Sequence, residues 1–167
     1  MPDTYGGKAG VRSPDSYPAA SDWDAIAVVT TSDATTTGQA LVDITGLTYP
    51  VAAASTYEFE ADLLTTASAD TNGVQVGVNV TQTPVTVEAT AEGNTTTTTI
   101  ASVGIQANNT ASAAFNTTSA GKGHVRIRGF VTTHATLAGT FSIQHLKPTA
   151  GTSTVKVGSS LRIRKVG

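Results

Sequence analysis

Cysteine is absent from the 167 residues of this chain, which excludes a disulfide framework and a thiolate metal site. Methionine occurs once and charged residues make up only 13% of the chain, so Met, Glu, Lys and Arg, which favour helices, are scarce. No apolar run approaches the roughly 18 residues that a membrane helix needs, and the polar N-terminus lacks the apolar segment of a signal peptide. We therefore expect one soluble domain with its own core, outside the general secretory route.

Threonine is abundant instead, with 31 occurrences, and valine is frequent, a mixture that suits pleated strands. Ten segments alternate apolar and polar residues with a period of two, and turn-forming residues separate them. The segments are residues 25–31, 39–45, 56–64, 73–81, 84–91, 97–107, 124–133, 140–147, 153–157 and 160–166. The pattern predicts an all-β fold, an antiparallel β-sandwich or jelly roll of about 8–10 strands over residues 25–167.

The charges are unevenly distributed along the chain. All twelve acids lie between Asp3 and Glu92, and eight of the ten bases lie between Lys122 and Lys165. The first 92 residues therefore carry a net charge of −10 and the remainder a net charge of +8. A basic C-terminal half is compatible with nucleic acid or an anionic surface as a partner. We favour the alternative, in which early and late strands interleave in one sheet, because like charges placed opposite each other would destabilise it.

The segment TYEFEADLL, residues 56–64, places three carboxylates on one face of a strand, and two later segments each place two arginines on one face. We expect these groups to pair between strands, within one subunit or between neighbours, and to set register and partner choice. The groups are Glu58, Glu60, Asp62, Arg126, Arg128, Arg162 and Arg164. A metal site is disfavoured because consecutive same-face positions of a strand are about 6.6–7 Å apart. A glycosidase-like acid pair is disfavoured because nothing marks one carboxylate for a raised pKa.

Other candidate chemistry is weak. His124, His134 and His145 lack the tight spacing of a zinc motif, and ordinary polar or half-buried histidines are the simpler interpretation. No phosphate-binding glycine loop, nucleophile elbow or zinc-protease signature is present in the sequence. We therefore expect no catalytic residues, no metal, no cofactor and no enzyme activity.

The first 24 residues differ in character from the rest. Three prolines, three glycines and almost no aliphatic residues prevent a packed element, yet three of the nine aromatic residues lie here. We interpret residues 1–24 as an extended arm, up to about 80 Å long when fully stretched, that docks on a neighbouring subunit or partner through aromatic anchors. The docking candidates are Tyr5, Arg12, Tyr17 and Trp23. The alternatives are a disordered leader and, for Trp23, a plug at the base of the sandwich.

Three short stretches carry a resemblance to a known family: LTYPV at residues 47–51, TYEF at residues 56–59 and GSSLRIR at residues 158–164. Over about residues 26–167 the chain resembles a β-sandwich module that is widespread in structural proteins of tailed bacteriophages. In that module a Thr-rich strand leads to a turn at the first stretch, and the last stretch belongs to the closing strand. The resemblance implies a non-enzymatic virion component that commonly forms homotrimers on capsids, tails or fibres.

On this basis we expect a capsid decoration or cement protein that binds the phage major capsid protein, or other virion proteins, as a homotrimer and stabilises the shell. The expected location is the virion, assembled in the reducing bacterial cytoplasm, which the lack of cysteine fits. Contact with nucleic acid or membrane is not expected. The alternative is a tail or fibre module that recognises a host surface glycan through its loops. A third hypothesis, an enzyme such as a depolymerase, requires a carboxylate pair in a cleft.

Overall fold

The computed structural model describes residues 25–28, 32–68, 73–96, 98–116, 122–148 and 151–167. Within these ranges the chain forms eleven strands and no helix, and hence no helix that could span a membrane. The strands are β1 (Ala25–Val28), β2 (Ala34–Thr36), β3 (Val42–Val51), β4 (Thr56–Ala67), β5 (Gln75–Val80), β6 (Thr86–Asn94), β7 (Ile100–Ile105), β8 (Lys122–Thr132), β9 (Gly139–Leu146), β10 (Ser153–Val155) and β11 (Ser160–Lys165).

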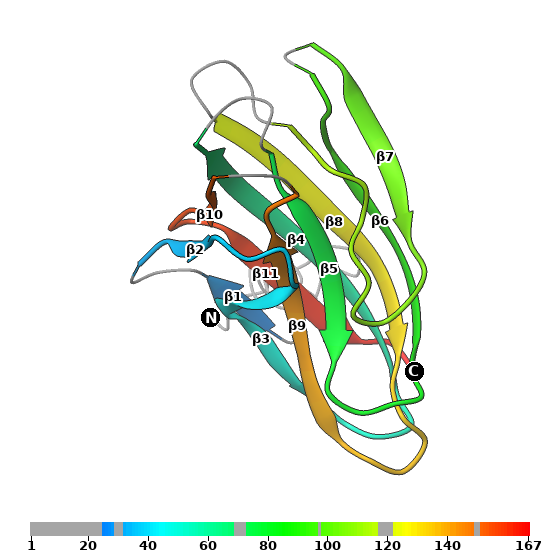
Figure 1. The fold of residues 1–167 in the computed structure, drawn as a ribbon. Helices are drawn as coiled ribbons and strands as arrows, with labels where there is room; N and C mark the ends of the chain where they lie inside the picture. The colour runs from blue at the N-terminus through cyan, green and yellow to red at the C-terminus, as the bar shows by residue number, and fades with distance from the viewer. Residues whose placement is uncertain (1–24, 29–31, 69–72, 97, 117–121, 149–150) are drawn as a thin grey trace, which may run out of the picture.

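The strands form two antiparallel sheets that pack face to face as a β-sandwich, which confirms the predicted fold class (Figure 1). The large sheet has the order β1-β11-β4-β8-β6-β7, and β10 pairs with both β2 and β4 beside this path. The small sheet has the order β3-β9-β5. Early and late strands interleave, because β4 lies between the C-terminal strands β11 and β8.

Each of the ten alternating segments of the sequence overlaps a strand, and the structure departs from the sequence-based expectations in two places. β2 is an additional strand of three residues, too short to show a period. The expectation of a turn at residues 47–51 is wrong, because they form the second half of β3. A register shift between Asp43 and Thr48, with Gly46 at a φ of 92°, bends the strand there. Pro50 is tolerated because β3 pairs with β9 alone among the described strands, so one side of it needs no N–H donor.

The core lies between the two sheets. Along β4, buried residues alternate with partly exposed ones, so Tyr57, Phe59 and Leu63 face the small sheet. Phe59 of β4 and Phe141 of β9 are 1% and 0% exposed, and their ring centroids lie 4.8 Å apart. This contact joins the two sheets directly, and full burial of a side chain of this kind stabilises the fold by about 1.5–3 kcal/mol.

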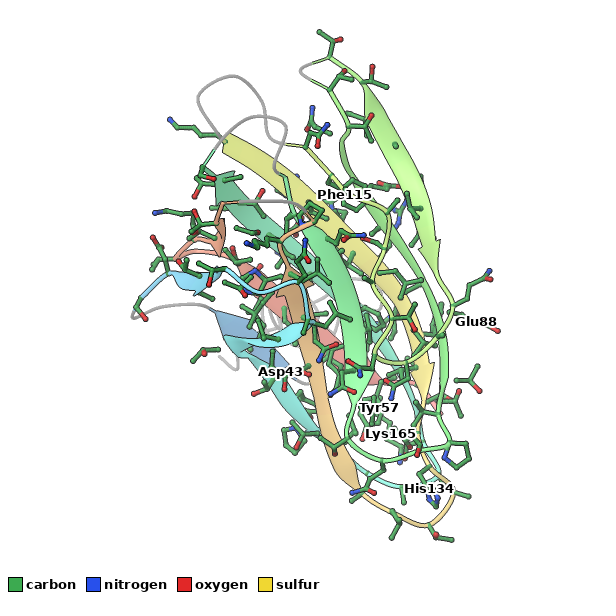
Figure 2. All side chains as sticks on the ribbon, viewed as in Figure 1. Asp43, Tyr57, Glu88, Phe115, His134 and Lys165 are labelled. Carbon is green, nitrogen blue, oxygen red and sulfur yellow. The ribbon has the colours of Figure 1, made fainter. Side chains whose placement is uncertain are left out.

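The β5 edge of the small sheet and the β7 edge of the large sheet differ in whether another described segment covers them. The β5 edge of the small sheet is followed by an irregular segment, residues 106–116, in which Ser112 donates its N–H to the Val76 carbonyl at 2.8 Å. Val74 and Phe115 exchange two further backbone bonds of 2.8 Å, at the end of the molecule away from His134 (Figure 2). The large sheet ends at β7, beyond which no described strand lies (Figure 1).

Candidate functional site

The outer face of the large sheet gathers charged side chains of four neighbouring strands, β11, β4, β8 and β6, and we call it the charged face. Each strand contributes because its alternate residues face the core, which turns the polar set outward. The titratable residues of the charged face are Glu58, Glu60, Asp62, Glu88, Glu92, Lys122, His124, Arg126, Arg128, Arg162 and Arg164. All seven residues that the sequence selected for charge pairing belong to it.

The three carboxylates of β4 are held by arginines of the strands on either side. Glu58 lies opposite Arg164 of β11, whose Nη2 and Nε lie 2.5 and 2.7 Å from the same carboxylate oxygen. Asp62 lies opposite Arg126 of β8, whose Nε donates to Asp62 Oδ1 at 3.1 Å and lies 3.3 Å from Glu60 Oε1. These contacts lie within a single chain and tie β11, β4 and β8 together.

The other two arginines do not bind the carboxylates of β4. Arg128 Nη2 donates to Glu92 Oε1 of β6 at 3.0 Å, although its register partner on β4 is Glu60. Arg162 also lies opposite Glu60 but has no ion-pair partner among the described residues. The residues chosen from the sequence for charge pairing did not include Glu88 or Glu92. The alternation of residues 84–91 continues to Glu92 and could have shown that both acids lie on one face.

The ion pairs of the charged face are partly exposed. The pKa of Arg126 is raised, mainly because its guanidinium donates a hydrogen bond to Asp62, with the charges of Asp62 and Glu60 adding to the effect. Arg164 and Glu58 are 34% and 30% exposed, so water and salt screen their attraction. A pair of this kind contributes at most about 1 kcal/mol. Its larger consequence is for strand register, because a one-residue slip would point these charges into the core.

A hollow of about 450 Å³ lies on the charged face over β4, β8 and β6. The side chains that line it are Glu58, Glu60, Glu88, Thr90, Arg128 and Phe130. The Phe130 ring is 46% exposed, and Glu88 has no ion pair among the described residues. The hollow thus offers an aromatic ring, a hydroxyl, a carboxylate and a guanidinium to a polar ligand or partner surface. Across the described part of the chain, no three histidine or carboxylate side chains gather as metal ligands.

The three histidines have separate roles. His124 Nε2 lies 3.3 Å from Asp62 on the charged face. His134 accepts two backbone N–H bonds of 3.1 Å within its own turn. His145 is buried in the core, and burial lowers its pKa to about 4. The sequence pattern of residues 140–147 signalled a strand at His145 but not that both of its faces are buried.

The expected docking residues of the N-terminal arm, Tyr5, Arg12, Tyr17 and Trp23, lie outside the described residues. The arm, and with it the boundary between residues 1–24 and the sandwich, therefore stays a prediction.

No protein-family model matches the chain, and no curated protein matches it. Among solved structures, one of the infectious bursal disease virus Gt strain covers 85% of this chain at 12% identity with a TM-score of 0.23. One of the Gx strain covers 86% at 14% identity with a TM-score of 0.18. This chain spans 42% and 39% of those two chains. Likenesses with TM-scores this low carry no argument about function.

Proposed function

We propose that the protein is a structural component of a tailed-phage virion that acts without catalysis, and more specifically a capsid decoration or cement protein bound to the shell as a homotrimer. The observation that carries the proposal is that the carboxylates of β4 form ion pairs with arginines of the neighbouring strands. Glu58 is held by Arg164, and Asp62 and Glu60 by Arg126, within one chain. The residues best placed for acid–base chemistry thus join strands of the sheet.

The resemblance to phage virion modules supports the same proposal. Two of its three stretches lie on paired strands, because residues 56–59 begin β4 and residues 158–164 run into β11, which pairs with β4. The sandwich has a contiguous core and an ion-paired outer face, so we expect it to bind as a rigid body. A rigid body that bridges several capsid subunits stabilises a shell by adding contact area, because it loses little conformational entropy on binding.

Antibody-gold labelling of intact virions of the source phage, viewed by electron microscopy, tests the location. Label spread over the head supports decoration. A second measurement compares the melting temperature of heads with and without the bound protein, which we expect to be higher with it. Label confined to the tail, or heads that melt at the same temperature in both states, contradicts the decoration role.

A second function, recognition of a host surface glycan by a tail or fibre module, is favoured by one observation. Phe130 is 46% exposed beside the hollow that Glu88 and Thr90 also line, and aromatic rings stack on sugars. The candidate surface is thus a sheet face and not the loops that the sequence suggested. Binding to purified host envelope glycan that is lost in Phe130→Ala, and kept in the exposed control Leu64→Ala, would establish this function in place of decoration.

Enzyme activity on such a glycan is the third hypothesis. It requires Glu58 or Glu60 to act on a substrate in the hollow that both line. We expect no depolymerisation of host glycan by the purified protein. A measured activity that is lost in Glu58→Gln or Glu60→Gln would overturn the non-catalytic proposal.

A further inference from the structure

The exposed edge of β7 has the properties of a strand-pairing surface. β7 (Ile100–Ile105) pairs with β6 on one side and is the last strand of the large sheet. Among the described residues, no backbone or side-chain hydrogen bond reaches β7 from the other side. As far as the described residues extend, the outward N–H and C=O groups of this edge are open to another strand.

The sequence of β7 lacks the usual protection of an open edge. Natural proteins shield exposed edges with charged residues, proline, bulges or covering segments. The strand reads IASVGI, and residues 93–121 contain no charged residue and no proline. By contrast, residues 106–116 cover the β5 edge of the small sheet. The open edge thus carries no group that would repel an identical strand.

The side chains of β7 are complementary to each other across such a pairing. On the outward face they run from Ile100, which at 73% exposure is the most exposed large apolar side chain described, through Ser102 to Gly104. Gly104 lines a hollow of about 460 Å³ on the outer face over β6 and β7, together with Thr86–Thr90 and Gln106. The bulky apolar side chain of Ile100 therefore lies at one end of the outward face of β7, and the hollow beside Gly104 lies at the other end.

We propose that two copies of this chain pair through β7, antiparallel about a twofold axis, with Ser102 opposite Ser102 of the partner subunit. Directly opposed residues of an antiparallel pair point to the same face, so the register must keep outward residues together. This register places Ile100 opposite Gly104 of the partner subunit, where its side chain enters the hollow. Ala101 then lies opposite Val103 of the partner subunit on the core-facing side.

The contact is small, because only six residues of each copy take part. The area that it buries is less than the roughly 1,200 Å² that stable complexes bury. The pairing therefore depends on concentration and forms most readily where copies are held close together. It does not rest on the virion role. The proposed homotrimer has a threefold axis and needs a different surface, so either contact can fail without the other.

Cysteine trapping tests the register, because the chain contains no cysteine of its own. A single Ser102→Cys change would place two thiols directly opposite each other, at the Cα separation of about 4.4–6.8 Å that a disulfide needs. Under mild oxidation of the purified full chain at high concentration, we expect Ser102→Cys to form a covalent dimer at least about ten-fold faster than the exposed control Thr140→Cys. Ile100→Cys alone should dimerise slowly, whereas its mixture with Gly104→Cys should give the mixed dimer quickly.

A blocking variant completes the test. Adding Ile100→Lys to the Ser102→Cys chain replaces an exposed side chain, so the fold should be kept while trapping slows to the rate of the control. Circular dichroism and melting of each variant verify folding. Equal trapping rates for Ser102→Cys, Ile100→Cys and Thr140→Cys, or trapping that Ile100→Lys leaves unchanged, would overturn the proposal. So would capture of a strand from a different virion protein at this edge without self-pairing.

Discussion

His145 should make the fold lose stability as the pH falls from 7 toward 4. Its side chain lies in the core, 1% exposed, and its Nδ1 has no hydrogen-bond partner among the described residues. Burial lowers the pKa from 6.5 to about 4, because the charged imidazolium would lose its hydration. Between these two values the unfolded chain binds a proton that the folded chain does not, so stability rises with pH across this window.

The size of the effect follows from the difference between the two pKa values. A separation of about 2.5 pH units corresponds to about 3 kcal/mol of unfolding free energy, at 1.36 kcal/mol per unit. The stabilisation is fully present above the unfolded pKa of 6.5 and has been lost once the pH reaches about 4. Since a domain is usually stable by about 5–15 kcal/mol in total, the loss should be readily measured.

The assay is urea unfolding followed by circular dichroism at pH 7, 6, 5 and 4, for the wild type and for His145→Leu, which keeps a side chain of similar size. We expect the wild type to lose about 3 kcal/mol more than the variant between pH 7 and pH 4, because the carboxylates titrate alike in both chains. The exposed control Leu64→Ala, which removes no titratable group, should follow the wild type. Parallel pH curves for wild type and His145→Leu would refute the reasoning, and His145→Gln serves the same comparison if leucine prevents folding.

Two further predictions concern the large sheet. Gly129→Ala should destabilise the protein by about 1–3 kcal/mol in urea unfolding, because a Cβ there would lie 2.3 Å from a backbone carbonyl oxygen of β6. Gly104→Ala, where the nearest atom would be 3.8 Å away, should be close to neutral, and equal effects of the two changes would contradict this. Arg164→Glu should cost about 1 kcal/mol by opposing Glu58, and adding Glu58→Arg should restore most of it. A double variant no more stable than the single one would show that the pair does not couple.

The strands of the large sheet were predictable because their alternation is local. In β4 every second residue is apolar, so residues 56–64 alone indicate which side faces the core. The interleaving of early and late strands could be predicted from the charge distribution. The acids lie early in the chain and eight bases lie late, and like charges on adjacent strands would destabilise the sheet. The structure places them accordingly, with Glu58 beside Arg164 and Asp62 beside Arg126.

The choice of ion-pair partner within the sheet and the course of residues 47–51 were not predictable from the sequence. Arg128 lies opposite Glu60 on one side and Thr90 on the other, yet its guanidinium reaches diagonally to Glu92. A long side chain selects among acids on both adjacent strands, and sequence spacing does not show which strand lies on the far side. The resemblance implied a turn at residues 47–51, and the edge position of β3 explains why Pro50 fits within a strand there.

The uncharged stretch of residues 93–121 connects these observations. It follows the last acid and precedes the base at Lys122, so it lacks the ion pairs that fix register on the charged face. Its second part, residues 106–116, gains order by hydrogen bonding to the β5 edge. Its first part forms β7, which has the same lack of charge but an edge with no described partner. A charged residue in β7 would protect that edge in a monomer. A strand that pairs with its own copy is instead expected to lack charged residues, as β7 does.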